Sequence, residues 1–590
     1  MRVAITQFVT TSNVQENLAS CIRVINEAAV CKPSIIVLPE YCNTLFHNAY
    51  PGDEFLENNQ NGYVDHYHAW NEALSIDDLF LQSIAKLAKK HHCYIVINVT
   101  LKRELLNEFS TISQENTIKP AISVTSCLFC PLGKLIHQAD KQTLTEHEST
   151  YFISANKAAE VVKTSIGALG FLSGYDSMTF ALPRHLALQG AQLLCHSMCT
   201  STLDQCNLHN AARACENNLF IANANKMGKS QILSQEGKVL VKINHNKEGI
   251  AFIDIALDSN NSEIGFNNKR RPDGTLLAKQ RRPELYQALT AEIKQTNQNK
   301  ADSSDFIAQD TPKTTNAAIF ATYKPNEQAI EDVCHYIDNN LSDIIQLPEL
   351  FFVADKTSTL DATQRIKIET LSKLMITQVS AVLRPFQYVC TSLIINRIHQ
   401  SVLISERGVI ALQPQLHFCQ RYQWTTLGNN INIIELPLEQ GCIKVAMLTA
   451  DDANIPELVS LVALKGIHLL LVPFDIQNPN EVEHSLLSRA AEHRICIIAA
   501  SHEKSFAQAF SDKNNKTKVR KFTGLIANLA KDFSFLSQQS LSSFKITKCN
   551  SFINQPLVKY QQGKITKALV YPMATCNKLS LTQITLPLIN

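Results

Sequence analysis

The chain has 590 residues, and its 55 basic and 53 acidic side chains leave a formal net charge of only +2 at neutral pH. This balance excludes a nucleic-acid or membrane-surface role that depends on bulk charge. An apolar fraction of 45% is too high for a disordered chain, and the length suits either about four average domains or two large ones.

Targeting and cofactor signals are absent from the sequence. The N-terminal residues lack the charged start, long apolar stretch and small-residue cleavage site of a secretory signal. No apolar stretch approaches the roughly 18 residues that span a bilayer. The 17 cysteines show no metal-ligand spacing. We therefore expect a soluble, cytoplasmic protein with reduced thiols and no metal or other cofactor.

Apolar patterns in the first half of the chain predict alternating strands and helices, which favours a layered α/β fold. The predicted strands lie, in chain order, at residues 3–8, 34–38, 93–100, 122–130, 166–172, 191–196 and 219–225. The predicted helices lie at residues 14–28 and 80–88, with further helices between the last three strands.

The second half of the chain repeats short segments of the first. Gly190–Leu194 is similar to Gly466–Leu470, and Arg213–Glu216 is similar to Arg489–Glu492. Both pairs are 276 residues apart and occur in the same order. Two matches in one register predict a tandem duplication of a single domain.

A polar segment divides the two predicted copies. Residues 291–316 contain almost no large apolar side chains, which predicts a solvated linker. The sequence thus predicts a better preserved domain at residues 1–290 and a degenerate domain at residues 317–590.

Several segments of the first half occur in a characteristic order. They are Leu38–Glu40 at the end of a predicted strand, then Asp140–Glu148, then Ile166–Asp176. Together they resemble the nitrilase, or carbon-nitrogen hydrolase, superfamily. Later landmarks of that family are similar to Leu188–Leu194, Arg213–Asn217 and Arg281–Tyr286. The resemblance covers residues 1–288 and is weaker over residues 317–535.

The resemblance implies two tandem αββα sandwiches and a Cys–Glu–Lys site that attacks an amide or nitrile carbon. In such a site a carboxylate takes the thiol proton, and a lysine stabilises the oxyanion. Carried over by position, Glu40 is the general base, Lys141 the oxyanion cation and Glu148 a second carboxylate.

The nucleophile position departs from the family pattern in both halves. The family has cysteine two residues before the aspartate of its elbow, and here that position before Asp176 is Gly174. Glycine has no side chain, so no thioester can form there. The matching position in the second half is Ala450, and the lysine position holds Gln415. Glu349 alone remains of a second site, so we expect the second domain to be inactive.

Three replacements for the thiol can be considered in the first domain. Ser173 is adjacent, but neighbouring strand residues point to opposite faces, so we expect it to face away from Glu40. Cys199 follows the next predicted strand, although buried cysteines usually serve packing. A water activated by Glu40 beside Lys141 is the third route.

Two other clusters are weaker candidates. His66 and His68 could share a strand face and bind a metal, but no third ligand is evident, and a polar loop is the favoured interpretation. The basic residues of 269–271 and 281–282 are interpreted as a solvated or interface surface.

We favour a catalytically impaired protein that acts as a ligand-binding, regulatory or assembly module. The alternative is an active amidase-type hydrolase with a displaced nucleophile or an activated water. A third hypothesis is a scaffold in which the two copies form an intramolecular pseudo-dimer, with a homo-oligomer as a further option. The expected ligand is a small amide, nitrile or carboxylate in the first domain, with no nucleic-acid or membrane partner.

Overall fold

The structure is a computed structural model that describes most of the chain. The described residues are 1–46, 65–103, 121–199, 205–226, 228–245, 247–257, 265–289, 312, 314–322, 324–339, 341–478, 480–493, 495–508, 518–529, 544–546, 568–570 and 579–587. Contacts divide the chain into two compact units between Lys269 and Arg270, which we call unit 1 and unit 2.

Unit 1 contains two six-stranded sheets. The first has the order β12-β1-β2-β3-β4-β5 and consists of β1 (Arg2–Gln7), β2 (Ile35–Val37), β3 (Tyr94–Arg103), β4 (Ala121–Phe129), β5 (Leu135–Asp140) and β12 (Gly249–Asp254). The second has the order β11-β10-β9-β8-β7-β6 and consists of β6 (Val162–Thr164), β7 (Gly167–Ser173), β8 (Leu193–Met198), β9 (Phe220–Asn225), β10 (Ser230–Leu233) and β11 (Val239–Ile243).

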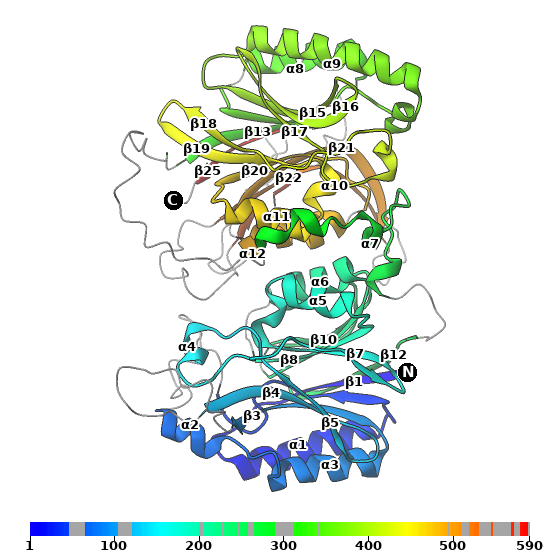
Figure 1. Cartoon of the computed structure of the whole chain (residues 1–590), viewed down its shortest axis with the longest axis vertical. Coiled ribbons are helices and arrows are strands. Elements are labelled where there is room, and N and C mark those ends of the chain that lie inside the picture. Colours follow the sequence, from blue (N-terminus) through cyan, green and yellow to red (C-terminus); the bar gives the residue numbers. More distant parts are fainter. Residues whose placement is uncertain are drawn as a thin grey trace. The chain divides into compact units, whose positions relative to one another are not determined.

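Helices cover the outer faces of both sheets in unit 1 (Figure 1). The helices of unit 1 are α1 (Val14–Ala29), α2 (His66–Glu72), α3 (Leu79–His91), α4 (Glu146–Ser149), α5 (Ala181–Leu188) and α6 (Ala211–Asn217), with the short helices η1 (Gly174–Ser177), η2 (Gln205–Asn210) and η3 (Phe266–Asn268). Helix α1 begins where the Asn13 side chain accepts hydrogen bonds from the amides of Gln15 and Glu16. Its stripe of buried residues includes Cys21 and Ile25 and packs on the first sheet.

The described part of unit 1 contains two large layers of apolar side chains. One lies between the first sheet and helices α1 and α3, and it contains Ile25, Ile36 and Ile84. The other lies between the two sheets and contains Ile5 and Phe171. The predicted layered α/β fold is confirmed, because each predicted strand is buried on the faces that its apolar pattern requires.

Unit 2 follows the same strand order. Its first sheet has the order β17-β16-β15-β14-β13-β25 and consists of β13 (Thr314–Thr322), β14 (Ile344–Glu349), β15 (Tyr388–Ile395), β16 (Ile398–Ser405), β17 (Gly408–Pro414) and β25 (Leu579–Pro587). Its second sheet has the order β18-β19-β20-β21-β22-β23, with β24 on β22, and consists of β18 (Ile433–Leu438), β19 (Gly441–Met447), β20 (Leu469–Pro473), β21 (Cys496–Gln508), β22 (Lys518–Leu529), β23 (Phe544–Ile546) and β24 (Ala568–Val570).

The helices of unit 2 also cover the outer faces of its sheets (Figure 1). They are α7 (Leu277–Gln280), α8 (Asn326–Asp338), α9 (Ala362–Val382), α10 (Ala450–Ala453), α11 (Pro456–Leu464) and α12 (Ser488–His493), with η4 (Pro283–Leu285), η5 (Gln287–Leu289), η6 (Lys356–Leu360), η7 (Gln420–Tyr422) and η8 (Glu481–Leu487). None of the helices among the described residues combines the length and the apolar composition that crossing a bilayer requires.

The unit boundary differs from the predicted domain boundary. Contacts place residues 270–289 in unit 2, whereas the predicted first domain extends to residue 290. The reason is that Arg282 donates hydrogen bonds to the carbonyls of Leu416 and Gly428, each at 2.7 Å. Most of the predicted linker lies outside the described residues, and residues 314–316 already belong to strand β13.

Candidate functional site

Four predicted site positions of unit 1 come from four separate elements. Glu40 follows β2, Lys141 follows β5, Glu148 lies in α4 and Gly174 begins η1 after β7. The Glu40 amide donates to the carbonyl of Met198 at 3.2 Å, which ties the loop after β2 to the end of β8. The fold therefore brings together the carboxyl ends of β2 and β5 in one sheet, the end of β7 in the other sheet, and helix α4.

The three charged side chains form one buried cluster. The Lys141 ammonium donates to Oε1 of Glu40 at 2.8 Å and to Oε1 of Glu148 at 2.5 Å. The Tyr41 hydroxyl donates to the same Glu148 oxygen. Oε2 of Glu40 is buried and accepts no hydrogen bond from any residue that the structure describes. Lys141 and Glu148 thus form hydrogen bonds within the cluster, whereas the buried Oε2 of Glu40 accepts none from the described residues.

The cluster gives its two carboxyl groups different pKa values. Burial raises the pKa of Glu40 to about 7, although the charge of Lys141 opposes this rise. Burial also favours a higher pKa for Glu148, but the charge and hydrogen bond of Lys141 outweigh it and lower the pKa. Burial works against the charge of Lys141, yet the two carboxylates raise its pKa. Near neutral pH, Lys141 and Glu148 are charged and Glu40 exchanges a proton.

The turn at Gly174 resembles the backbone of a nucleophile elbow, and glycine gives this position no side chain. Gly174 has a φ of +50° at a strand-to-helix turn, the strained conformation in which such elbows present a nucleophile. Asp176 accepts hydrogen bonds from the amides of Ser173 at 3.0 Å and Thr143 at 2.8 Å, which fixes the turn. A Cβ atom at residue 174 would meet the Lys141 ammonium and both carboxylate oxygens of Glu40.

His196 on β8 is a part of this turn that the sequence patterns do not indicate. Its Nε2 lies 3.0 Å from the Gly174 carbonyl. Burial lowers the pKa of His196 to about 4, so the ring is neutral at physiological pH and donates this hydrogen bond. No local sequence signal marks the residue, because its partner is 22 positions away on another element.

The two alternative nucleophiles lie in unsuitable surroundings. Ser173 Oγ accepts a hydrogen bond from Asn98 at 2.9 Å and lies 3.2 Å from Ser126 Oγ. Cys199 is buried in an apolar cluster with Tyr41, and burial raises the pKa of its thiol to about 12. At neutral pH this thiol remains protonated and poorly nucleophilic.

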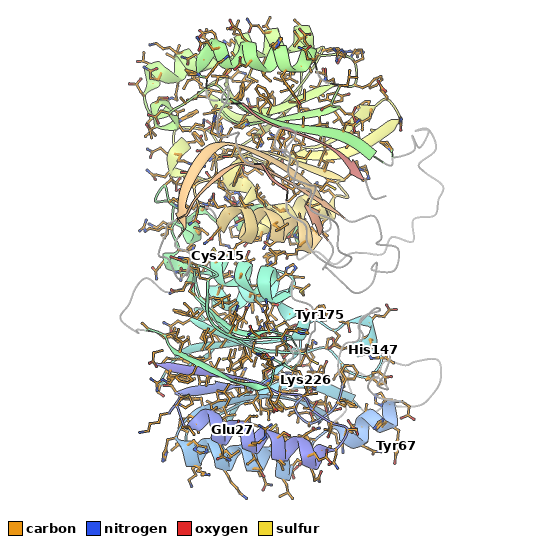
Figure 2. All side chains as sticks on the ribbon, turned by 180° about the vertical axis from the view of Figure 1, so that it is seen from behind. Glu27, Tyr67, His147, Tyr175, Cys215 and Lys226 are labelled. Carbon is orange, nitrogen blue, oxygen red and sulfur yellow. The ribbon has the colours of Figure 1, made fainter. Side chains whose placement is uncertain are left out.

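A second buried lysine holds the loop after Glu40. The Lys226 ammonium donates to the carbonyls of Tyr41 at 3.1 Å, Thr44 at 3.0 Å and Phe46 at 3.3 Å. Figure 2 shows Lys226 inside unit 1, whereas Tyr67 of α2 lies at the periphery. Burial lowers the pKa of Lys226, but its three hydrogen bonds require the protonated amine. Lys226 therefore fixes the loop that carries the cluster.

The predicted histidine pair does not form a metal site. Asp65 caps α2, so His66 and His68 lie in the first turn of a helix, neither on a strand nor in the polar loop that the sequence favours. Residues two apart on a helix point in different directions. His68 instead pairs with Glu72 at 3.1 Å.

The matching region of unit 2 contains a different set of charges. Gln415 directly follows β17, as Lys141 directly follows β5 in unit 1. Its side chain lies 3.1 Å from the His399 ring and donates to the His417 carbonyl at 2.6 Å. Arg421 of η7 donates to Glu349 at 3.3 Å. The expectation that Glu349 alone remains is therefore incomplete, because a cation reaches it from another element.

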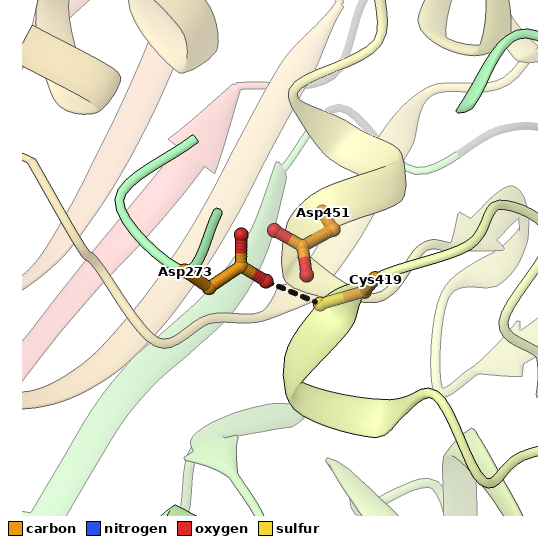
Figure 3. Close-up of side chains that lie close together, drawn as sticks. All are labelled: Asp273, Cys419 and Asp451. Atoms are coloured by element: carbon orange, nitrogen blue, oxygen red, sulfur yellow. Dashed lines mark hydrogen bonds between the residues drawn. The ribbon is translucent and has the colours of Figure 1, made fainter. Parts of the chain in front are cut away.

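Unit 2 also brings Asp273, Cys419 and Asp451 together (Figure 3). The Cys419 thiol donates to Asp273 at 3.2 Å, and burial raises the thiol pKa well above its usual range. Burial favours a higher pKa for Asp451, but the charges of Arg421 and Arg271 outweigh it and lower the pKa to about 2. A protonated thiol beside two guanidinium groups is a poor metal ligand set, so we assign no metal here.

Comparisons with known proteins found one family model and several solved structures that match part of the chain. Residues 2–262 match the family model described as carbon-nitrogen hydrolase. The solved structures that match include a mutant amidase of the nitrilase superfamily from Nesterenkonia AN1, at 17% identity over 43% of this chain and 90% of that one, with a TM-score of 0.34. Another is an amidase from Nesterenkonia sp., at 17% identity over 49% and 96%, with a TM-score of 0.35. No curated protein matches the chain.

Proposed function

We propose that the carbon-nitrogen hydrolase domain of residues 2–262 has kept its polar site and lost its covalent chemistry. In this proposal the protein is a ligand-binding, regulatory or assembly module. The observation that carries it is at the elbow: residue 174 is glycine, and the Lys141 ammonium lies where its side chain would begin. A nucleophile contributes orders of magnitude to the rate of such a reaction, so its loss is decisive.

The proposal extends to the second unit. The shared strand order and the common 276-residue spacing support a tandem duplication. In this proposal unit 2 is the degenerate copy, and the intramolecular pseudo-dimer belongs to the separate scaffold hypothesis. The remaining polar groups of unit 1 suit a small amide, nitrile or carboxylate, since Lys141 offers a cation and Glu40 an open oxygen.

A second candidate function is hydrolysis by an activated water. The pKa of Glu40, raised by burial to about 7, is near the value at which a general base works best at neutral pH. The open Oε2 atom could accept a proton from such a water. This route needs the water to enter between Glu40 and Lys141, whose ammonium would stabilise the oxyanion.

An amide and nitrile hydrolysis screen separates the two candidates. It compares the wild type with Glu40→Gln and Gly174→Cys, and uses Glu146→Gln of the exposed first turn of α4 as the matched control. The module proposal predicts no turnover in the wild type. Turnover that Glu40→Gln abolishes and Glu146→Gln leaves unchanged would establish the water mechanism instead. Turnover that arises only in Gly174→Cys would show an intact site that lacks its thiol.

A further inference from the structure

The region of unit 2 that matches the unit 1 site contains buried carboxyl groups at positions where unit 1 has other side chains. Asp475 lies 276 residues after Cys199, and Asp451 lies 276 residues after Tyr175. Both aspartates are buried, as is Glu349, the counterpart of Glu40. The positions that hold a thiol and a phenol in unit 1 therefore hold carboxyl groups in unit 2.

Arg421 fills the space between these carboxyl groups. Its guanidinium donates to Oδ2 of Asp475 at 2.8 Å, to Oδ2 of Asp451 at 3.0 Å and to Oε2 of Glu349 at 3.3 Å. The Arg421 side chain is only 11% exposed. A planar guanidinium with five donors can serve several carboxylates at once, which the point charge of a lysine cannot do with the same geometry.

Residues of the segment 270–289 form hydrogen bonds with this cluster and with its neighbours. Asp273 accepts a hydrogen bond from the Arg421 amide at 3.3 Å, and the Arg271 guanidinium donates to the Asp451 carbonyl at 3.3 Å. Thr275 Oγ1 accepts from the Gln420 amide at 2.8 Å. The buried hydroxyl of Tyr422 has no hydrogen-bond partner within the part of the chain that the structure describes.

We propose that the unit 2 site is a guanidinium-binding cage, formed by Glu349, Asp451 and Asp475, whose resident ligand is the side chain of Arg421. The cage is closed to a small substrate because the chain supplies its own cation. It anchors residues 270–289 to the rest of unit 2 through the neighbouring Arg271 and Asp273. This inference does not depend on what unit 1 does.

The test empties the cage and supplies its ligand from solution. Arg421→Ala removes the guanidinium and leaves the carboxyl groups, and Trp424 reports on unfolding because it packs edge-on against Tyr422 with ring centroids 6.2 Å apart. A Trp70→Phe background removes the other tryptophan of the chain. We expect the melting temperature of this transition to fall by about 10 °C, as for other broken buried ion pairs.

Non-denaturing guanidinium chloride should then raise the melting temperature of Arg421→Ala relative to equal sodium chloride. It should not raise that of the wild type, whose cage is filled, nor that of Arg407→Ala, which removes an exposed arginine of the same unit. A variant as stable as the wild type would overturn the proposal. Equal responses to guanidinium and sodium in Arg421→Ala would also overturn it.

A charge-compensated variant keeps the test valid if Arg421→Ala does not fold. Arg421→Met combined with Glu349→Gln and Asp475→Asn removes the cation together with two of the carboxyl groups. We expect it to melt well above Arg421→Met alone and to show no response to guanidinium. A compensated variant that melts no higher than Arg421→Met would contradict the cage.

Discussion

The ammonium of Lys141 occupies the space into which a side chain at Gly174 would extend. A Cβ atom at residue 174 would also lie 2.8 Å from both carboxylate oxygens of Glu40. The side chains of Lys141 and Glu40 thus cover the turn at Gly174, where φ is +50°. The glycine at residue 174 and the pairing of Lys141 with Glu40 are therefore two aspects of one packing arrangement.

We first predict that Gly174→Ala destabilises unit 1 and disturbs its ion cluster. The new methyl group must displace Lys141 and Glu40, and alanine is strained at positive φ, for a loss of about 2 kcal/mol or more. Urea unfolding can be followed by Trp70 fluorescence in a Trp424→Phe background.

Gly190→Ala is the matched control for this substitution. Gly190 also has a positive φ, of +94°, but no atom lies within 4 Å of the position that a methyl group would take there. It should therefore lose stability through backbone strain alone and keep the wild-type dependence of stability on pH. A Gly174→Ala variant with that same unchanged pH dependence would contradict the crowding of Glu40 and Lys141.

We next predict that Lys141→Met strongly destabilises unit 1. Removal of the ammonium leaves Glu40 and Glu148 buried together without their cation, which costs about 3–5 kcal/mol. Lys238→Met removes an exposed lysine that pairs with Glu236 and should cost less than about 1 kcal/mol. Similar losses for the two variants would show that the buried pairing contributes little. Denaturant unfolding measures both.

The titration of Glu40 predicts how stability depends on pH. The folded protein holds the Glu40 proton more tightly than the unfolded chain does, because its pKa rises from 4.5 to about 7. The protonated Glu40 carboxyl therefore stabilises the folded state at acid pH. This contribution is lost as pH rises from 4.5 to about 7. Glu40→Gln should remove that part of the decline.

Other buried acids titrate in the same range, so the informative quantity is the difference between variants. Burial raises the pKa of Asp176 to about 6 and that of Glu481 to about 7. The exposed Glu146→Gln variant should retain the full wild-type decline. A wild type and a Glu40→Gln variant with parallel profiles between pH 4.5 and 7 would refute the raised pKa of Glu40.

The last prediction concerns the two buried lysines that hold equivalent loops. Lys226 donates to three carbonyls of the loop after Glu40, while Lys356 of unit 2 donates to the carbonyls of Leu350 at 3.3 Å and Val353 at 2.6 Å. Each buried carbonyl that loses its donor costs about 1–3 kcal/mol.

Lys226→Met should therefore destabilise unit 1 by at least about 3 kcal/mol, while Lys356→Met should affect unit 2. Trp70 and Trp424, one in each unit, report the two unfolding transitions separately. The role assigned to these lysines is wrong if each variant destabilises the other unit as much as it destabilises its own.

Local sequence patterns were sufficient for the most apolar strands of unit 1 and for helices α1 and α3. The buried strands β2 and β8 and the amphipathic helix α1 follow directly from apolar periodicity, because the interior selects side chains by their position on each element. The pattern missed the buried strand β10, and it missed β5, β6, β11 and β12, whose burial is incomplete. Such strands lack the continuous apolar signal of a core strand.

The sequence by itself determined that residue 174 has no thiol and that the segments of the two halves share one register. Only the tertiary structure decided where the charges meet. Lys141 and Glu40 are 101 residues apart, and their contact depends on how β2 and β5 end in space. Arg421 reaches Glu349 from 72 residues away, although Gln415 occupies the position that the sequence assigns to the cation. The physical reason is that a buried carboxylate requires a counter-charge, and any element that reaches it can provide one.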